Sequence, residues 1–390
     1  MATATIRQIH LFNSLAKRSG HSEGFVSSYS SNSQNRFRVR VQQRDNMTFS
    51  GQLRFFSQNL RPDSDEVEKA GEATDQISRA IHQLFRSHSV DRITPFGSYP
   101  KKTSVRGMMD VDIIVYINNR HPPFGDIIEE LYQIVQRNFD PHCTKNFFQV
   151  KLRYKGLKVD LLPATNFLPT FESHRCDVDR SIRIQHKRAL EYVMHQVEAG
   201  KEYLYSTSLS GVSVFFERRR SSFSHSLSRL AKYWCFSIPV TEGLVGRSSI
   251  MEYLGAYAAE QVAPDGEDIL AGFRYFLNMF DYTDNIHIYW TEFYDENDIP
   301  RDVRSQRPLL LDPCSPYNNF LRIKNNAHLL REMQPYAKAT LARLDAAITH
   351  FRQGINVDME TMISDNHLND SDTDEEEPHE EAENSMCILL

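Results

Sequence analysis

The stretch that decides the fold is residues 96–115, which read FGSYPKKTSVRGMMDVDIIV. It opens with the turn-forming pair Gly97-Ser98, continues as a short polar helix or loop, and ends in an apolar run that is typical of a strand and carries Asp110 and Asp112. Side chains i and i+2 on a strand project from the same face, so the two carboxylates lie side by side. They repel each other unless a cation lies between them, and Mg²⁺ takes oxygen ligands of this kind.

A third carboxylate follows on the next predicted strands. Residues 147–154 alternate apolar and polar side chains, Lys155-Gly156 predicts a turn, and residues 157–163 return as a strand with Asp160 on the polar face. Three acids on adjacent strands can hold two metal ions, which would activate an attacking hydroxyl and stabilise a leaving pyrophosphate. The Gly97-Ser98 turn would supply backbone N–H groups and a hydroxyl to a triphosphate.

Length and charge indicate two lobes and a body that is not basic overall. The 390 residues carry a net charge of −6, but residues 353–390 hold twelve Asp and Glu and no Lys or Arg, so the rest carries −6 + 12 = +6. Residues 1–50 account for +5 of this, which leaves about +1 for residues 51–352. Any nucleic-acid contact would therefore be a local patch. The five cysteines form no Cys-x-x-Cys pair, which argues against a zinc site or a disulfide framework.

The Gly-Ser turn, the Asp-x-Asp strand and the strand around Asp160 together resemble the nucleotidyltransferase signature of the polymerase-β superfamily. Within it they resemble the 2′-5′-oligoadenylate synthetases and the cGAS-like receptors. Residues 289–295 and 307–316 are similar to segments of the oligoadenylate synthetase C-terminal domain. The resemblance implies an α+β fold, with a polymerase-β-like mixed-sheet lobe, a helical C-terminal lobe and disordered tails. The expected regions are a basic Ser-rich extension (1–50), the catalytic lobe (51–202), the helical domain (203–352) and an acidic tail (353–390).

The resemblance also implies site residues. Residues 228–234 are similar to a synthetase helix whose two basic residues contact nucleotides, here Arg229 and Lys232, and residues 251–261 are similar to a helix in which Tyr257 would stack on a base. The chain departs from the family at Pro100, Lys102 and Met109, which puts substrate preference and loop conformation in doubt. The expected catalytic and metal-binding residues are Asp110, Asp112 and Asp160, and the expected nucleotide contacts are Gly97, Ser98, Lys101, Arg229, Lys232 and Tyr257.

Double-stranded RNA is the partner that the resemblance implies. A helix that starts at the capping residue Asp63 keeps one apolar face and carries cations on its other side, and residues 217–220 form a basic run. Such cations ordinarily lie on a solvated surface. In the synthetases, however, the equivalent regions bind RNA on the face opposite the active site. The resemblance implies that RNA binding there would order the metal site. The expected RNA contacts are Arg79, Arg86, Arg218 and Arg220.

Both tails carry separate expectations. Residues 1–50 are predicted to be disordered, although they also resemble a mitochondrial transit peptide or an upstream extension ahead of Met47. The chain ends in Cys387-Ile388-Leu389-Leu390, which predicts prenylation of Cys387, with the final Leu favouring a geranylgeranyl group. One prenyl chain anchors reversibly, and the acidic tail would be repelled by anionic lipid. We therefore expect a cytoplasmic protein that is partly on internal membranes.

The expected function is a double-stranded-RNA-activated, Mg²⁺-dependent enzyme that makes 2′-5′-linked oligoadenylates from ATP as an innate antiviral second messenger. Two alternatives stay open. A cGAS-like receptor would use the same three acids to make a cyclic dinucleotide from ATP and GTP. A catalytically silent relative would bind RNA at membranes without turnover. The oligomeric state is left open by the sequence.

Overall fold

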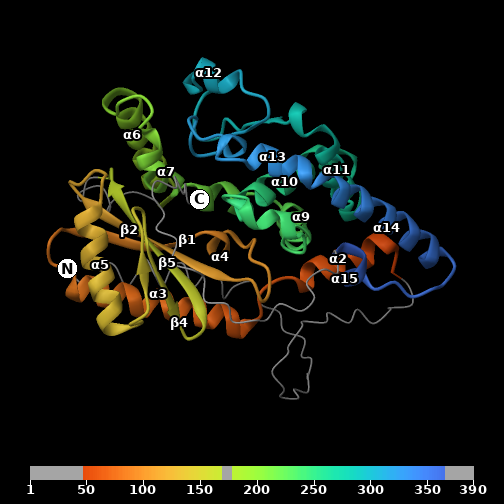
Figure 1. The fold of residues 1–390 in the computed structure, drawn as a ribbon, viewed down its shortest axis with the longest axis horizontal. Helices are drawn as coiled ribbons and strands as arrows, with labels where there is room; N and C mark the ends of the chain where they lie inside the picture. The colour runs from red at the N-terminus through yellow and green to blue at the C-terminus, as the bar shows by residue number, and fades with distance from the viewer. Residues whose placement is uncertain (1–46, 169–177, 365–390) are drawn as a thin grey trace. The chain divides into compact units, whose positions relative to one another are not determined.

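The computed structural model describes residues 47–168 and 178–364 (Figure 1). The predictions for residues 1–46, for residues 365–390 and for Cys387 lie outside the described residues. No helix within the two described ranges is long and apolar enough to cross a lipid bilayer.

A five-stranded mixed sheet with the strand order β1-β2-β5-β4-β3 forms the catalytic lobe. β2 and β5 pair in parallel, whereas β1 pairs with β2, and β4 with β3 and β5, in the antiparallel sense. The predicted turn between β4 and β5 is confirmed, because Lys155 and Gly156 both have positive φ, as a tight hairpin turn requires. The strands are β1 (Val90–Phe96), β2 (Asp110–Asn118), β3 (Thr144–Lys145), β4 (Val150–Tyr154) and β5 (Leu157–Asn166).

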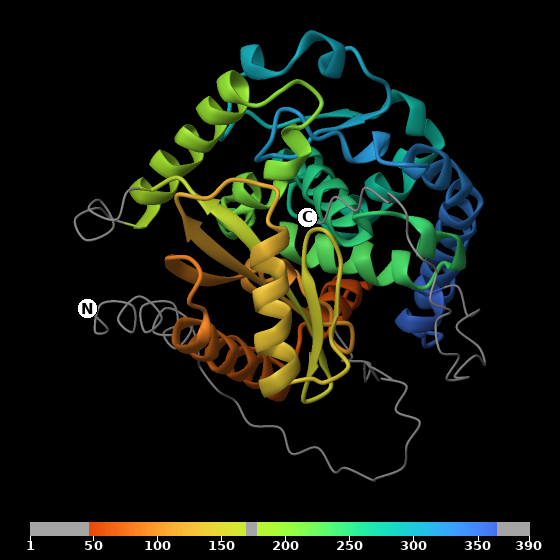
Figure 2. The same ribbon diagram turned by 60° about the vertical axis from the view of Figure 1, so that its left-hand side comes forward.

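Two helices, α3 (Ser64–Leu84) and α5 (Gly125–Asn138), cover one face of this sheet (Figure 2). The alternate residues of β2 from Val111 to Ile117 are fully buried against them, which leaves Asp110 and Asp112 on the other face. The predicted start of α3 is confirmed: Asp63 accepts the backbone N–H of Glu66, and Glu66 reciprocally accepts that of Asp63.

The second lobe is helical, as predicted, and its core is rich in aromatic side chains such as Trp234, Phe273 and Phe320. At Gly255 an added Cβ would lie 2.9 Å from the Cα of Ser228, so helices α9 and α10 pack backbone against backbone. The helices from α6 to α14 are α6 (Val178–Gln196), α7 (Ser206–Ser210), α8 (Ser213–Arg218), α9 (Ser222–Phe236), α10 (Arg247–Val262), α11 (Ile269–Asn278), α12 (Arg301–Arg304), α13 (Asn326–Glu332) and α14 (Gln334–Arg352). A small parallel pair of strands, β6 (His287–Ile288) and β7 (Leu309–Leu310), lies among them in the chain.

Three predicted boundaries are wrong. Helix α2 (Phe49–Asn59) belongs to the core of the helical lobe, not to the catalytic lobe, because Phe49, Leu53 and Phe56 are buried there. The predicted acidic tail begins too early, because α15 (Met359–Ile363) buries its apolar side chains in the same core. The predicted last helix, 326–351, is two helices, and Pro335 lies in the first turn of the second, where a missing N–H is tolerated.

Candidate active site

The three predicted carboxylates lie on one face of two neighbouring strands. Asp110 begins β2, and Asp112 follows two residues later on the same face. In the parallel pairing of β2 with β5, Asp112 lies directly opposite Asp160. Solvent reaches Asp110, while Asp112 and Asp160 are half-buried. The sheet therefore brings together the set that the sequence predicted.

The local environment disfavours the charged form of these acids. Burial raises the pKa of Asp112 well above its usual value, and the charges of Asp110 and Asp160 raise it further, while Lys101 and Lys232 oppose the shift. Burial is also the main cause that raises the pKa of Asp110, whose carboxyl group is crowded by protein atoms although solvent still reaches it. Burial raises the pKa of Asp160 in the same direction. A cation bound between the three groups would relieve their repulsion.

The Gly97-Ser98 turn closes against this cluster. Gly97 has a φ of +72°, and a Cβ built on it would lie 1.8 Å from Oδ2 of Asp112. Only glycine lets the backbone come this close to the carboxyl group. Ser98 begins the short helix α4 (Ser98–Lys101), and its Oγ lies 3.0 Å from Oγ of Ser104. Gly97 thus has a steric role besides the predicted contact through its N–H.

The donor set fits Mg²⁺, because three hard carboxylates share one face of adjacent strands. Nucleotidyltransferases of the polymerase-β superfamily, which the sequence resembles, generally use divalent metal ions. In the described ranges, no three His, Cys, Asp or Glu side chains already converge as the ligands of one ion would. The Asp112 carboxyl is turned toward the backbone of Gly97.

Lys101 and Lys232 are held by an acid that the sequence analysis missed. Glu252 of α10 lies 3.0 Å from Nζ of Lys101 and 2.6 Å from Nζ of Lys232, and it also accepts the hydroxyl of Thr103. Burial would raise the pKa of Glu252, but the two lysines lower it to about 2. The predicted direct phosphate contacts are thus not available here, since both lysines are buried in ion pairs behind the turn. Their charges act on Asp112 from there.

Arg229 holds the chain beyond α4 and does not face the carboxylates. Its guanidinium donates to the carbonyl of Lys102 (2.7 Å), the carbonyl of Ser57 (3.4 Å) and Oγ of Ser226 (3.2 Å). The residue is 1% exposed, and burial lowers its pKa to about 9. The predicted phosphate contact is therefore replaced by contacts that fix the loop and tie it to α2.

Tyr257 also lies elsewhere than predicted. It is half-buried at the edge of the helical core, where its ring lies 6.4 Å from the ring of Tyr275 on α11. This is the structural role that a tyrosine on a largely apolar helix ordinarily has. The α10 residue that reaches the turn is Glu252, one helical turn earlier.

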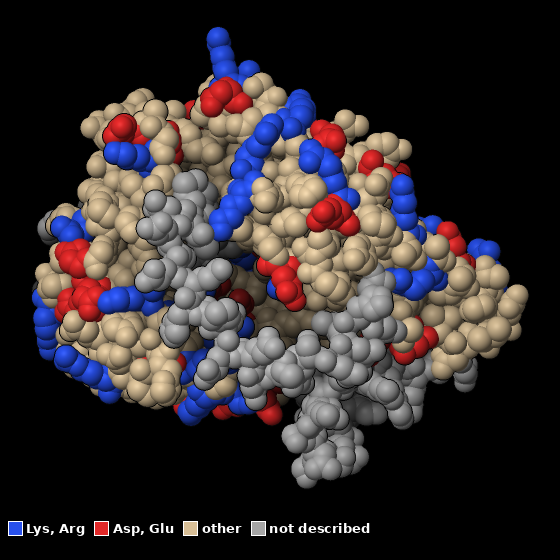
Figure 3. Space-filling model, viewed as in Figure 1, with Lys and Arg blue, Asp and Glu red and all other residues tan. Residues whose placement is uncertain are grey.

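The four arginines predicted to contact RNA differ in their exposure and in their partners. Arg79 on α3 and Arg86, two residues after the end of α3, are exposed, so their RNA contact stays a prediction. Arg218 is exposed, and its Nε donates to the carbonyl of Pro100 (2.7 Å) in α4. The side chain of Arg220 is 7% exposed and pairs with two carboxylates, Glu260 and Glu292, so its RNA contact stays a prediction that would require these ion pairs to open. Lys and Arg are interspersed with Asp and Glu over the face in Figure 3, in keeping with the near-neutral charge of the body.

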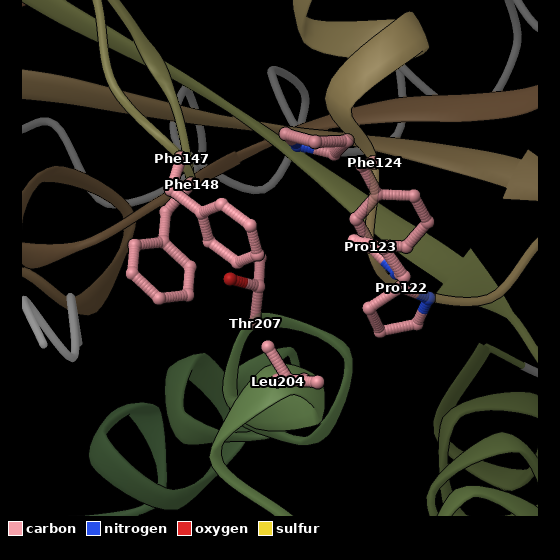
Figure 4. Close-up of a pocket in the computed structure, with 8 residues that line it drawn as sticks. Pro122, Pro123, Phe124, Phe147, Phe148, Leu204 and Thr207 are labelled. Atoms are coloured by element: carbon pink, nitrogen blue, oxygen red, sulfur yellow. The ribbon is translucent and has the colours of Figure 1, made fainter. Parts of the chain in front are cut away.

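An apolar pocket lies at the far end of the sheet (Figure 4). Its lining includes the residues that follow the end of β2, whereas Asp110 begins that strand. Pro163 of β5 also lines the pocket, three residues beyond Asp160, but none of the three carboxylates lines it. The pocket is therefore separate from the carboxylate cluster. It is lined by Pro122, Pro123, Phe124, Phe147, Phe148, Pro163, Leu204 and Thr207.

Two family models match the chain. The Second Messenger Oligonucleotide or Dinucleotide Synthetase domain matches residues 47–173. The model named 2′-5′-oligoadenylate synthetase 1, domain 2, C-terminus, matches residues 185–349. The first contains the sheet with the three carboxylates, and the second contains the helices that carry Arg229, Lys232 and Glu252.

Individual relatives agree with these models. 2′-5′-oligoadenylate synthase 1A of Rattus norvegicus is 24% identical over 264 residues, 59% of this chain and 71% of the relative. 2′-5′-oligoadenylate synthase 2 of Bos taurus is 25% identical, over 70% of this chain and 42% of the relative. The relative named inactive 2′-5′-oligoadenylate synthase 1B of Rattus norvegicus is 26% identical, over 60% and 69%. The solved structure of E. coli MS115-1 CdnC with ATP has a TM-score of 0.47 at 18% identity, covering 75% of this chain and 90% of that chain. With a polymerase-β-like sheet in the first lobe and an oligoadenylate synthetase model over the second, the chain belongs to the 2′-5′-oligoadenylate synthetase family of nucleotidyltransferases.

Proposed function

We propose that this protein is activated by double-stranded RNA and makes 2′-5′-linked oligoadenylates from ATP, with two Mg²⁺ ions, as an antiviral second messenger. The observation that carries the proposal is the placement of Asp110, Asp112 and Asp160 on one sheet face beside the Gly97-Ser98 turn. The family match of the helical lobe favours the oligoadenylate product.

The chain's own residues suit each part of this reaction. Ser98 and the backbone N–H groups of the turn would hold the donor triphosphate. Mg²⁺ held by the three acids would supply charge stabilisation at the transferred phosphate. Asp160 would accept the proton of the acceptor 2′-hydroxyl as that oxygen bonds to the α-phosphorus and the bond to pyrophosphate breaks.

RNA activation is supported by one link between the two lobes. Arg218 is exposed enough to meet a phosphate, and its Nε contacts the Pro100 carbonyl in the helix that follows the Gly97-Ser98 turn. RNA bound at Arg218, Arg79 and Arg86 would therefore act on the turn that closes against Asp112.

Two observations favour other candidates. The model that matches residues 47–173 describes dinucleotide as well as oligonucleotide synthetases, which keeps a cyclic dinucleotide made from ATP and GTP as the second candidate. One relative is named inactive, which keeps an RNA-binding protein without turnover as the third. The three intact acids favour the catalytic candidates.

The test is product analysis with the full chain. We would incubate it with ATP, GTP and Mg²⁺, with and without double-stranded RNA, beside an Asp112→Asn variant, and resolve the products by mass. A ladder of adenylates that requires both RNA and Asp112 supports the proposal. A single cyclic dinucleotide moves the protein to the second candidate. No product from the unsubstituted chain under any condition supports the third.

Membrane association is a separate proposal that rests on the C-terminal Cys387-Ile388-Leu389-Leu390. A geranylgeranyl group on Cys387 would hold a cytoplasmic protein reversibly on membranes. The acidic residues before it would weaken attraction to anionic lipid and so favour internal membranes.

A further inference from the structure

Four basic residues lie in the segments where α2 leads into α3 and where the chain leaves α4, and on the helix α9 that contacts them: Arg61, Lys102, Arg106 and Arg229. The backbone N–H of Arg106 donates to the carbonyl of Leu60 (2.8 Å), and its Nε donates to the carbonyl of Arg61 (3.1 Å). Arg229 donates to the carbonyl of Lys102 (2.7 Å). Burial is the main cause that lowers the pKa of Arg229, and the positive charge of Arg61 is the second cause. These contacts place the four residues in one cluster, called here the cationic cluster.

Among the residues that the structure describes, none of the four members of the cationic cluster forms an ion pair with Asp or Glu. Asp63 and Glu66, at the start of α3, accept backbone N–H groups of the first turn of α3 and of Gly107, and neither lies within ion-pair distance of the four cations. Like charges held together without an acid raise the free energy of the folded chain and attract an anion. Arg61 and Lys102 are exposed, so an anion can reach them.

The chain itself supplies a polyanion next to this cluster. Residues 365–390 contain ten Asp and Glu and no Lys or Arg. This segment begins directly after α15, and α15 packs on α2, which leads into Arg61 (Figure 1). The eleven residues of α2 span about 16 Å. The six residues from Ser364 to Asp370 reach about 20 Å when extended, so the acidic run reaches any point along α2.

We propose that the cationic cluster docks the chain's own acidic segment, residues 370–383, and that this segment competes there with the phosphates of nucleic acid. The tether favours this occupant over a free one, because joining two partners in one chain raises their effective concentration, to the millimolar range for a short linker. Docking weakens as salt screens the charges. The docking part stands on the cluster alone, whereas the competition part rests on the proposed activation by RNA.

Docking is tested without RNA, by carbodiimide coupling of carboxylates to lysine in the full chain at 50 mM salt. We expect cross-links from the acidic segment to Lys102 within one molecule. They should disappear at 500 mM salt, in a chain whose ten tail acids are Asn or Gln, and largely in Arg61→Glu. Arg137→Glu, an exposed cation on α5, is the matched control and should leave them unchanged. Tail cross-links whose yield is unchanged in Arg61→Glu, or that join two chains, would overturn docking of the segment within its own chain.

Competition is tested by titrating double-stranded RNA into the full chain and into the chain with the neutral tail. We expect the neutral tail to bind RNA three- to tenfold more tightly at 50 mM salt, with the difference gone at 300 mM. Equal affinity at both salt concentrations would refute competition. If neither chain binds RNA, the proposed RNA activation fails, and the cross-links still decide whether the tail docks.

Discussion

Replacing Glu217 with glutamine should stabilise the protein at neutral pH. Glu217 is fully buried, and neither of its carboxylate oxygens has a hydrogen-bond partner among the described residues. Burial first, and then the charge of Glu252, raises the pKa of Glu217 from near 4.5 to about 8, although Lys101 opposes the shift. The carboxyl is therefore protonated in the folded protein at pH 7.

The magnitude follows from proton linkage. The unfolded chain releases the Glu217 proton above about pH 4.5 and the folded chain keeps it up to about pH 8, so stability falls as pH rises through this window. At pH 7 the difference of 7 − 4.5 pH units corresponds to about 3.4 kcal/mol, at about 1.36 kcal/mol per unit. Glutamine has the same shape and no proton to lose, so Glu217→Gln recovers about 3 kcal/mol at pH 7 and little at pH 5.

The assay is urea unfolding of the full chain and of Glu217→Gln at half-unit steps from pH 5 to 8. We expect the free-energy difference between the two proteins to grow by about 1.4 kcal/mol per pH unit and to level off near pH 8. Glu68→Gln, on the exposed side of α3, is the control and should show no such growth. A difference that is constant across the pH range, or a destabilised Glu217→Gln at pH 7, would refute the reasoning.

Three further predictions concern the site, the network behind it and the C-terminus. Gly97→Ala forces a Cβ into Oδ2 of Asp112 and should lower kcat by about a hundredfold or more with the circular dichroism spectrum unchanged, while Gly71→Ala, whose nearest neighbour is a hydroxyl 3.9 Å away, should keep full activity. Glu252→Gln leaves two buried lysines without a charge partner and should destabilise the protein by about 3–5 kcal/mol in urea unfolding, and an effect under 1 kcal/mol would contradict the ion-pair assignment. Cys387→Ser should move the protein from the membrane to the soluble fraction of expressing cells, with loss of a prenyl mass, and an unchanged distribution would argue against the lipid anchor.

Local patterns determined much of this protein. The alternation of residues 110–117 indicated a strand with acids on one face, and Lys155-Gly156 indicated the hairpin that brings Asp160 alongside it. The capping pair Asp63 and Glu66 marked the start of α3. Each signal needs only neighbours in the chain, because strand period, turn chemistry and capping are local. The grouping of Asp110, Asp112 and Asp160 on one face of the sheet was therefore predictable from the sequence.

The roles of the cations were decided only by the tertiary structure. A basic residue at helical spacing has the same pattern whether it meets a nucleotide or a buried acid. Lys232 meets Glu252 twenty residues away, and Arg229 meets the carbonyl of Lys102 more than a hundred residues away. Arg220 is neutralised by two acids on other elements. Pairings of this kind depend on which faces meet when the lobes pack, and no local pattern encodes them.

The same reason explains why α2 and α15 lie in a different region of the fold from the one predicted. The apolar faces of α2 and α15 indicate that each helix is buried, but not against which core. Both pack into the helical lobe, although one precedes the catalytic lobe in the chain and the other lies at the start of the predicted tail. Hydrophobic periodicity determines which side of an element is covered, and only the folded chain decides what covers it.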